Sequence, residues 1–156
     1  MGTLGIAKCN NFVIIPKRSV MPKTYVVLYA EGGQSPFLAW VERQPPKVQD
    51  KLFDAVSRLE ELGHDLRRPE AEYLGKDLYE LRVKKGHVNY RPLYFFDDRK
   101  DKEGKTTLRR AVIAHGCTKE DAVHPTDIAL ALERRKKYLA NRAAHTYTPP
   151  TDPIDE

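Results

Sequence analysis

The 156-residue sequence predicts an α+β domain, a small sandwich in which helices cover one face of a largely antiparallel sheet. Three observations favour this class. A strand-like segment lies near the N-terminus, two adjacent segments carry apolar residues at helical spacing, and three strand-like segments follow close together. A last helical pattern precedes the C-terminus. The predicted order is therefore β-α-α-β-β-β-α.

The N-terminal half contains the first strand and two helices. Residues 24–30 are rich in β-branched and aromatic residues, a composition typical of a strand. Ser35 caps a short helix, and Pro36 occupies its first position. The second helix starts at Pro45-Pro46, repeats apolar residues at helical spacing and ends at Gly63. These elements predict a helical hairpin.

The C-terminal half supplies the rest of the sheet and one helix. Residues 64–76 are expected to form a loop. The three strands that follow are predicted at residues 78–83, 88–97 and 109–116. Residues 98–104 are charged and predict an exposed turn or hairpin tip. The last helix is expected at residues 125–141, with its RRKK run (134–137) on the solvated side.

The two ends of the chain differ from this central domain. Residues 1–22 show no periodicity and predict a loose extension, residues 23–147 form the domain, and residues 148–156 form an acidic, proline-rich tail expected to be disordered. The apolar run at residues 12–15 is far shorter than a signal sequence or a membrane span. These features exclude a membrane protein and favour the cytoplasm.

The cysteine and histidine residues do not predict a metal site or a cofactor. Two cysteines, Cys9 and Cys117, form no disulfide framework and are expected to be reduced thiols. The five histidines lack metal-ligand spacing. We therefore expect chemistry that needs neither a metal ion nor an organic cofactor.

Positive charge is concentrated in the predicted strands. Residues 82–119 hold 11 Lys and Arg against 4 Asp and Glu, a net charge of +7, whereas the whole chain carries +5. The rest of the chain is slightly acidic. This distribution predicts a binding site for a polyanion, with RNA as the leading candidate.

The period of two along a strand places the charged residues on one face. A symmetric turn at residues 84–87 would set Arg82 opposite Asn89 and Glu80 opposite Arg91. All four side chains then share a face, and the apolar residues lie on the other. One interpretation is that the arginines are ordinary solvated ion-pair partners. Because one glutamate cannot neutralise both, we favour a bound anion, and arginine suits phosphate.

Further residues extend this predicted site. His115 is a candidate acid or base, and Lys119 a candidate phosphate ligand. His87 is a second choice for proton transfer. Most aromatic residues nearby are expected in the core, but Phe95 shares the face of Arg91 and could stack on a base. The predicted RNA-binding residues are Lys84, Lys85, His87, Asn89 and Phe95.

Several motifs occur together in a fixed order. They are L-G-K-D-L-Y-E-L-R at 74–82, Y-R-x-L-Y-F-F at 90–96, H-G-x-T-K-E at 115–120, a proline with an A-x-x-R helix, and A-H-T-Y at 144–147. Together they resemble the RelE/HigB superfamily of bacterial toxins, in particular its phage-derived Gp49-like or HigB-like branch. The resemblance covers residues 23–147.

The resemblance implies a RelE-like fold and the toxin of a type II toxin–antitoxin system. Such toxins are mRNA endoribonucleases that inhibit translation, usually cleave mRNA in the ribosomal A site, and need no metal ion. A cognate antitoxin, often a helix-turn-helix protein encoded by a neighbouring gene, holds them inactive. Carried over by position, the implied catalytic residues are Arg82, Arg91, His115 and Lys119.

Cleavage of this kind uses the RNA 2′-hydroxyl as the nucleophile and leaves a 2′,3′-cyclic phosphate. The two arginines and Lys119 would stabilise charge on the phosphorane, and His115 would transfer a proton.

The sequence departs from the family pattern at two positions. Glu120 stands where some members have a second lysine. Pro92 has no backbone N–H, so its strand either loses one hydrogen bond to a neighbouring strand or lies at the edge of the sheet. Three alternatives therefore stay open: a noncatalytic RNA-binding module, a protein-interaction module, and an inactive prophage-derived toxin.

Overall fold

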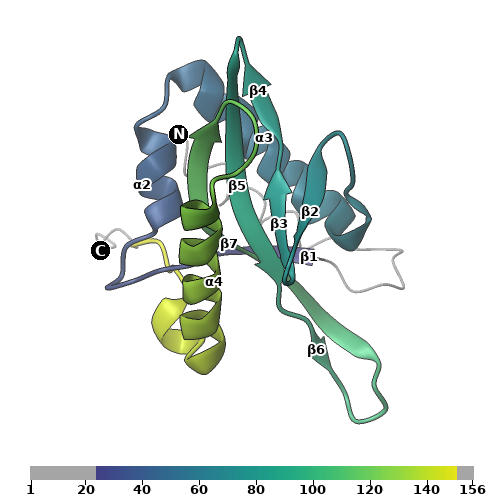
Figure 1. Cartoon of the computed structure of the whole chain (residues 1–156). Coiled ribbons are helices and arrows are strands. Elements are labelled where there is room, and N and C mark those ends of the chain that lie inside the picture. The colour runs from purple at the N-terminus through teal and green to yellow at the C-terminus, as the bar shows by residue number, and fades with distance from the viewer. Residues whose placement is uncertain (1–23, 151–156) are drawn as a thin grey trace, which may run out of the picture.

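The computed structural model describes residues 24–150 and confirms the predicted α+β class (Figure 1). The expected N-terminal extension, Cys9 and most of the C-terminal tail lie outside these residues. In chain order the elements are β1 (Thr24–Leu28), α2 (Pro36–Glu42), α3 (Pro46–Leu62), the 3-10 turn η1 (Gly63–Asp65), β2 (Ala71–Gly75), β3 (Leu78–Leu81), β4 (Val83–Lys85), β5 (Val88–Phe96), β6 (Arg99–Lys100), β7 (Thr106–Lys119), α4 (Pro125–Ala140) and η2 (Ala143–His145).

The strands form one open sheet with the order β1-β7-β5-β3-β2. β4 continues the line of β3 and also pairs with β5, while β6 pairs with β7. Only the pairing of β1 with β7 is parallel among these strands. No helix within residues 24–150 is long and apolar enough to cross a bilayer.

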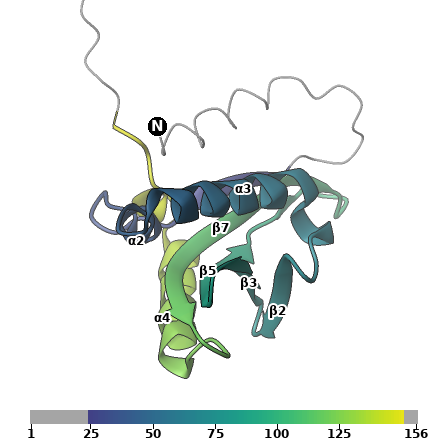
Figure 2. The same cartoon turned by 90° about the horizontal axis from the view of Figure 1, so that it is seen from above.

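The helices cover both faces of the sheet, not one. α2 and α3 pack on the face that contains Ala111 and Ile113, and they form the larger core with these residues. α4 packs on the opposite face, where its Tyr138 joins Val112 in a second cluster. Figure 2 shows α3 and α4 on opposite sides of β7. The expectation of helices on a single face is therefore wrong for α4, because β7 is apolar on both faces.

The predicted loop at residues 64–76 contains a strand. β2 pairs with β3 through Ala71 opposite Leu81 and Glu72 opposite Glu80. It lies at the edge of the sheet, and its Tyr73 is 52% exposed. The short sequence of β2 shows no alternation of polar and apolar residues, so β2 is a strand because its backbone pairs with that of β3.

The hairpin between β4 and β5 is shifted by two residues from the predicted register. Val83 pairs with Tyr90 and Lys85 with Val88, so the turn is made by residues 86 and 87 alone. The same ladder sets Arg82 opposite Arg91 and Glu80 opposite Leu93. Gly86 has a φ of +64°, a conformation that favours glycine in such a tight turn. A shift of two residues keeps every side chain on its predicted face.

Pro92 occupies a central strand, where proline is uncommon. β5 pairs with β7 on one side and with β3 and β4 on the other. The second ladder is interrupted between Glu80 and Val83, where the backbone N–H of Arg82 faces β2 and donates to the carbonyl of Glu70. The interruption lies beside the position where Pro92 lacks an N–H, so the central strand tolerates this residue.

The segment from Arg99 to Arg109 forms a two-stranded arm, which we call the basic arm. β6 and the first part of β7 pair within it, and it extends away from the helices at the lower right of Figure 1. Its turn is built by Asp101, whose Oδ1 accepts the backbone N–H groups of Glu103 and Lys105, each at 2.9 Å. The predicted exposed hairpin tip is thus confirmed.

A buried carboxylate holds the root of the basic arm. Asp97 accepts hydrogen bonds from Tyr138 at 2.9 Å and from two nitrogens of Arg142 at 2.8 and 2.9 Å, and it lies 3.2 Å from Arg110. Burial alone would raise the pKa of Asp97, but the bonds from Arg142 and Tyr138 hold this pKa below its ordinary value of 3.8.

Replacing Asp97 by asparagine is expected to lower the free energy of unfolding by about 2 kcal/mol at pH 7. Because the pKa of Asp97 is lower in the folded state, the ionised carboxylate stabilises the fold above pH 3.8. This stabilisation disappears as the pH falls through the pKa of Asp97 in the folded protein. The wild type and Asp97→Asn should therefore converge in stability in acid. Urea unfolding at pH 7 and pH 3, followed by fluorescence of the single tryptophan, measures the difference in stability.

The control is Asp50→Asn, at an exposed residue of α3. A difference between wild type and Asp97→Asn that does not change with pH would contradict the stabilising role of the ionised Asp97 carboxylate.

Candidate active site

A β-bulge in β7 decides on which side of the sheet His115 lies. The ladder between β5 and β7 contains one extra residue, Ala114, between Ile113 and His115. Ile113 packs against α2 and α3, so uninterrupted alternation would place His115 on that side. The bulge instead places His115 on the side of α4, where its ring meets Asp127.

Side chains from three neighbouring strands share this face. Arg82 lies opposite Arg91 of β5, and Arg91 lies opposite Cys117 of β7. The next row contains Asn89 and Lys119. The structure thus brings the four predicted catalytic residues to the same side of the sheet: Arg82, Arg91, His115 and Lys119.

Glu80 is a buried carboxylate that contacts both arginines. Its Oε2 accepts a hydrogen bond from Nη1 of Arg82 at 2.6 Å, and its Oε1 lies 3.3 Å from Nε of Arg91. The side chains of Glu80 and Arg91 are only 5% and 6% exposed. Burial lowers the pKa of Arg91, and the charge of Glu80 opposes this effect.

A second carboxylate neutralises the arginines further. Nη1 of Arg82 also donates to Oε1 of Glu72 at 2.9 Å, and Glu72 belongs to β2, the strand that the sequence did not predict. We call Glu72, Glu80, Arg82 and Arg91 the Glu80 cluster. The argument that one glutamate leaves an unneutralised positive charge on this face is therefore wrong, because two carboxylates face two guanidiniums.

The ion pairs still leave guanidinium donors available. Arg82 uses Nη1 for both carboxylates, and Arg91 uses Nε for Glu80 and Nη1 for the carbonyl of Tyr90. Within residues 24–150, Nη2 of neither arginine has a hydrogen-bond partner. A guanidinium held through its other nitrogens can offer this Nη2 group to a phosphate.

Asp127 organises a second group on the same face. Its Oδ1 lies 2.8 Å from Nε2 of His115, and its Oδ2 lies 2.7 Å from Nζ of Lys119. Burial opposes the ionisation of Asp127, but hydrogen bonds from Lys119 and His115 hold its pKa below the ordinary value. With Arg134, which contacts His115, these residues form what we call the Asp127 cluster.

Both ring nitrogens of His115 are engaged. Nη1 of Arg134 lies 3.2 Å from Nδ1 and also donates to the carbonyl of Ala114 at 2.8 Å. Because Arg134 has only donors, these contacts favour the neutral tautomer in which Nε2–H donates to Asp127. His115 can therefore act on a substrate only if one of these contacts is exchanged.

The predicted RNA-binding residues fall into three groups. Lys84, Lys85 and His87 are exposed at the tip of the hairpin between β4 and β5. Asn89 donates to the backbone carbonyl of Glu120 at 3.1 Å and so secures the end of β7. The Glu120 side chain is exposed and makes no ion pair within the described residues.

Phe95 does not belong to the site. Its side chain is 0% exposed and packs edge-on against Tyr138 of α4, with ring centroids 5.6 Å apart. It does share the face of Arg91, as predicted, but α4 covers that part of the face. The prediction of base stacking by Phe95 is therefore wrong, and the residue belongs to the core.

Sequence reasoning missed three residues of the site: Glu72, Asp127 and Arg134. Glu72 had no recognisable strand pattern. Arg134 was expected on the solvated side of the last helix, yet it points to the sheet and contacts His115. Asp127 and Arg134 are seven residues apart on either side of the buried Ala131, so helical spacing could have placed both on the inner face.

One group of side chains has the spacing of a metal site. Potential ligand atoms of His115, Cys117 and Asp127 lie within 4.8 Å of one another. The surroundings fit a cation poorly, because Lys119 and Arg134 already occupy Asp127 and His115. Burial raises the pKa of the Cys117 thiol to about 12, which disfavours the thiolate that a metal would need.

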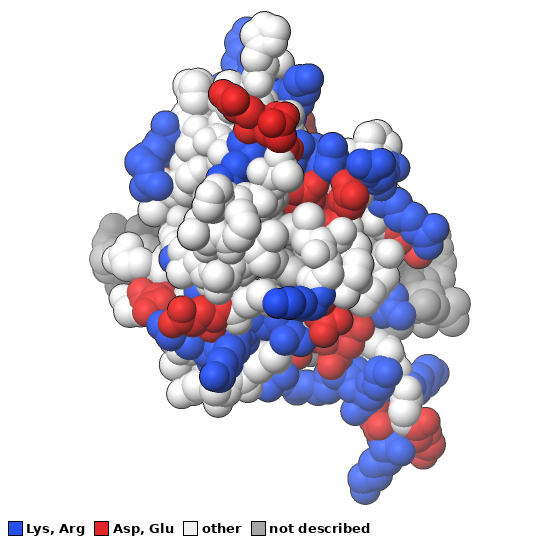
Figure 3. Space-filling view, viewed as in Figure 1, with Lys and Arg blue, Asp and Glu red and all other residues white. Residues whose placement is uncertain are grey.

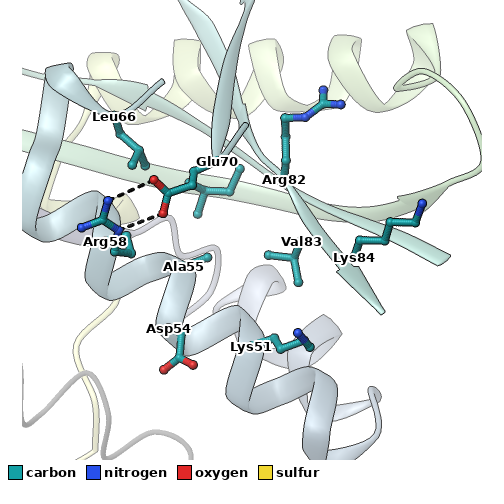
Figure 4. Close-up of a pocket in the computed structure, with 10 residues that line it drawn as sticks. Lys51, Asp54, Ala55, Arg58, Leu66, Glu70, Arg82, Val83 and Lys84 are labelled. Atoms are coloured by element: carbon teal, nitrogen blue, oxygen red, sulfur yellow. Dashed lines mark hydrogen bonds and ion pairs between the residues drawn. The ribbon is translucent and has the colours of Figure 1, made fainter. Parts of the chain in front are cut away.

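A pocket lies on the other face, between α3 and β4 (Figure 4). Leu66 and Val83 line it, and Arg58 pairs with Glu70 at its rim at 2.8 Å. The guanidinium of Arg82 points away from it in Figure 4. Arg82 also lines this pocket, so the pocket borders the Glu80 cluster but contains no residue of the Asp127 cluster.

Comparison with known proteins gives one family. A family model described as Phage derived protein Gp49-like (DUF891) matches residues 39–136, which include all members of the Glu80 and Asp127 clusters. No curated protein matches the chain. Because the family model matches more than half of the chain, the protein belongs to the phage-derived Gp49-like family.

Proposed function

We propose that this protein is the toxin of a type II toxin–antitoxin system and cleaves mRNA without a metal ion. In this proposal it belongs to the RelE/HigB superfamily, acts on translated mRNA at the ribosome in the cytoplasm, and is neutralised by an antitoxin encoded by a neighbouring gene. Membership of the phage-derived family supports the proposal, as does the chemistry of the face beneath α4.

One observation carries this proposal. Arg82 and Arg91 come from adjacent strands to one face, and each keeps an Nη2 group without a hydrogen-bond partner among residues 24–150. Two such donors can hold the nonbridging oxygens of one phosphodiester and stabilise the additional charge of the phosphorane. The ion pairs with Glu80 fix the two guanidiniums before the substrate arrives, which lowers the cost of ordering them.

The same face offers groups for proton transfer. RNA cleavage by the 2′-hydroxyl needs a base that accepts the proton of this hydroxyl and an acid that protonates the 5′-oxygen leaving group. Glu80 lies between the two arginines, and the pair of His115 and Asp127 lies across β5 from it. We assign phosphate binding to the arginines and Lys119, and proton transfer to His115 with Asp127 as its orienting partner.

Expression in a bacterium tests this function. Induction of the full chain alone should arrest growth, and co-expression of the adjacent gene should restore it. Cellular mRNA should then carry new ends with a 2′,3′-cyclic phosphate, which a ligase specific for that terminus can map. Growth arrest without new mRNA ends, or new ends without cyclic phosphate, would contradict the proposed chemistry.

A second candidate is a noncatalytic RNA-binding or protein-interaction module, including an inactive prophage-derived toxin. A specific observation favours it: Glu72, Glu80 and Asp127 pair with every predicted catalytic side chain. Such a network stabilises a fold without any substrate. Normal growth on expression, together with tight binding of RNA or of the adjacent gene product, would favour this candidate.

A further inference from the structure

The cations that lack an ion-pair partner are not spread evenly. On the face beneath α4, the predicted catalytic residues are all paired with carboxylates. In the basic arm, by contrast, none of the described ion pairs involves its five cations: Arg99, Lys100, Lys102, Lys105 and Arg109. Four of these lie within seven residues and are exposed. Against these five cations the arm holds two acidic residues, Asp101 and Glu103, so it carries a net charge of +3 at the lower right of Figure 3.

The structure fixes the direction of the arm at its root. On the side of α4, Asp97 is bound by Tyr138 and Arg142. On the other side, Asp98 lies 3.0 Å from His64, whose ring stacks on Phe96 at 3.7 Å. Two consecutive acidic residues thus anchor the arm to opposite faces of the domain. An arm held in this way presents its cations at a defined place relative to the body.

The side chains of the arm fit one class of partner. The stretch from Arg99 to Lys105 contains no aromatic or large aliphatic residue. The exposed large apolar side chains of the described residues, Tyr73, Val88 and Leu130, lie elsewhere. A protein interface usually has an apolar centre, and recognition of unpaired bases usually needs stacking side chains. The four cations of this stretch outnumber Asp101 and Glu103, and they suit the sugar-phosphate backbone of folded RNA, which binding proteins contact without reading its sequence.

We propose that the basic arm is a second RNA-binding site, which contacts the phosphate backbone of folded, double-helical RNA independently of sequence. Binding of RNA by the arm requires no cleavage at the Glu80 cluster, so this proposal goes beyond the proposed enzymatic function. Phosphate contacts release counterions from RNA, and the affinity of this site should therefore depend steeply on salt.

Binding of the full-length protein to a hairpin RNA tests the arm. The probe is a fluorescent RNA hairpin with 2′-O-methyl groups throughout, which keeps the A-form helix but cannot be cleaved by 2′-hydroxyl attack. The arm variant replaces Arg99, Lys100, Lys102 and Lys105 by glutamine. We expect its affinity to fall more than about tenfold at 100 mM salt, and the slope of log K against log salt to become shallower by at least about 2.

A matched control separates the arm from overall charge. The control variant replaces one arginine and three lysines that are also exposed and without described ion pairs, namely Arg43, Lys47, Lys76 and Lys136. It carries the same net charge as the arm variant but should keep most of the affinity and of the salt slope. Equal losses in both variants, or an unchanged slope in the arm variant, would overturn the proposal. Weaker binding of the adjacent gene product with unchanged RNA binding would overturn it as well.

The outcome is independent of catalysis. If growth arrest and cyclic phosphate ends are never observed, the enzymatic proposal fails while the binding result still decides the role of the arm. Conversely, an active nuclease whose arm variant binds the hairpin normally would keep the enzymatic proposal and refute this one. Circular dichroism of both variants confirms that each is folded.

Discussion

Replacing Arg91 by alanine is expected to abolish growth arrest and to lower the rate of RNA cleavage by about 10²–10³-fold or more. The guanidinium of Arg91 shares Glu80 with that of Arg82, and its Nη2 group would bind the phosphate in the proposed mechanism. Cleavage of a short RNA by purified protein, quantified through the cyclic phosphate product, measures the effect. Arg91→Lys should restore little activity, because an ammonium cannot make the paired contacts of a guanidinium.

A fold control accompanies this experiment, because Arg91 is buried and its removal leaves Glu80 paired with Arg82 alone. Unfolding followed by Trp40 fluorescence must show that the variant is folded at the assay temperature. Arg58→Ala is the matched control, since Arg58 also pairs with a glutamate but lies on α3, on the other face of the sheet. Full activity of folded Arg91→Ala, or equal losses in both variants, would contradict the assigned role.

Replacing Phe95 by alanine is expected to destabilise the protein by about 3–5 kcal/mol, a typical cost for a large-to-small change in a core. The side chain is fully buried against Tyr138, so its loss leaves a cavity between β5 and α4. Urea unfolding measures this change, and it should be much larger than the change for Phe53→Ala, because Phe53 is only partly buried.

The leucine variant distinguishes a core residue from a base-stacking residue. Phe95→Leu removes the aromatic ring but keeps much of the apolar volume, so we expect a smaller loss of stability and unchanged RNA binding at a temperature where the variant is folded. A folded Phe95→Leu protein that loses RNA affinity would instead show that the ring contacts RNA.

The glutamates of the Glu80 cluster show how one missed strand altered the interpretation of the site. The sequence indicated a face with two arginines and one glutamate, because β2 has no alternating pattern. The pairing of β2 with β3 adds Glu72 and completes the neutralisation of this face. An edge strand of five residues is defined by its neighbour's hydrogen-bonding groups, and single-sequence patterns contain no information about them.

Sequence periodicity alone determined the α+β class, the three helices and the common face of Arg82 and Arg91, because these follow from spacings of 2 and 3.6 residues along the chain. Even a register error of two residues left that face unchanged. Only the tertiary structure decided three further features: the bulge that turns His115 toward α4, the position of α4 over Phe95, and the carboxylates that hold each cation. Each depends on contacts between segments distant in the chain, and such contacts are set by packing and by the pairing of buried charges.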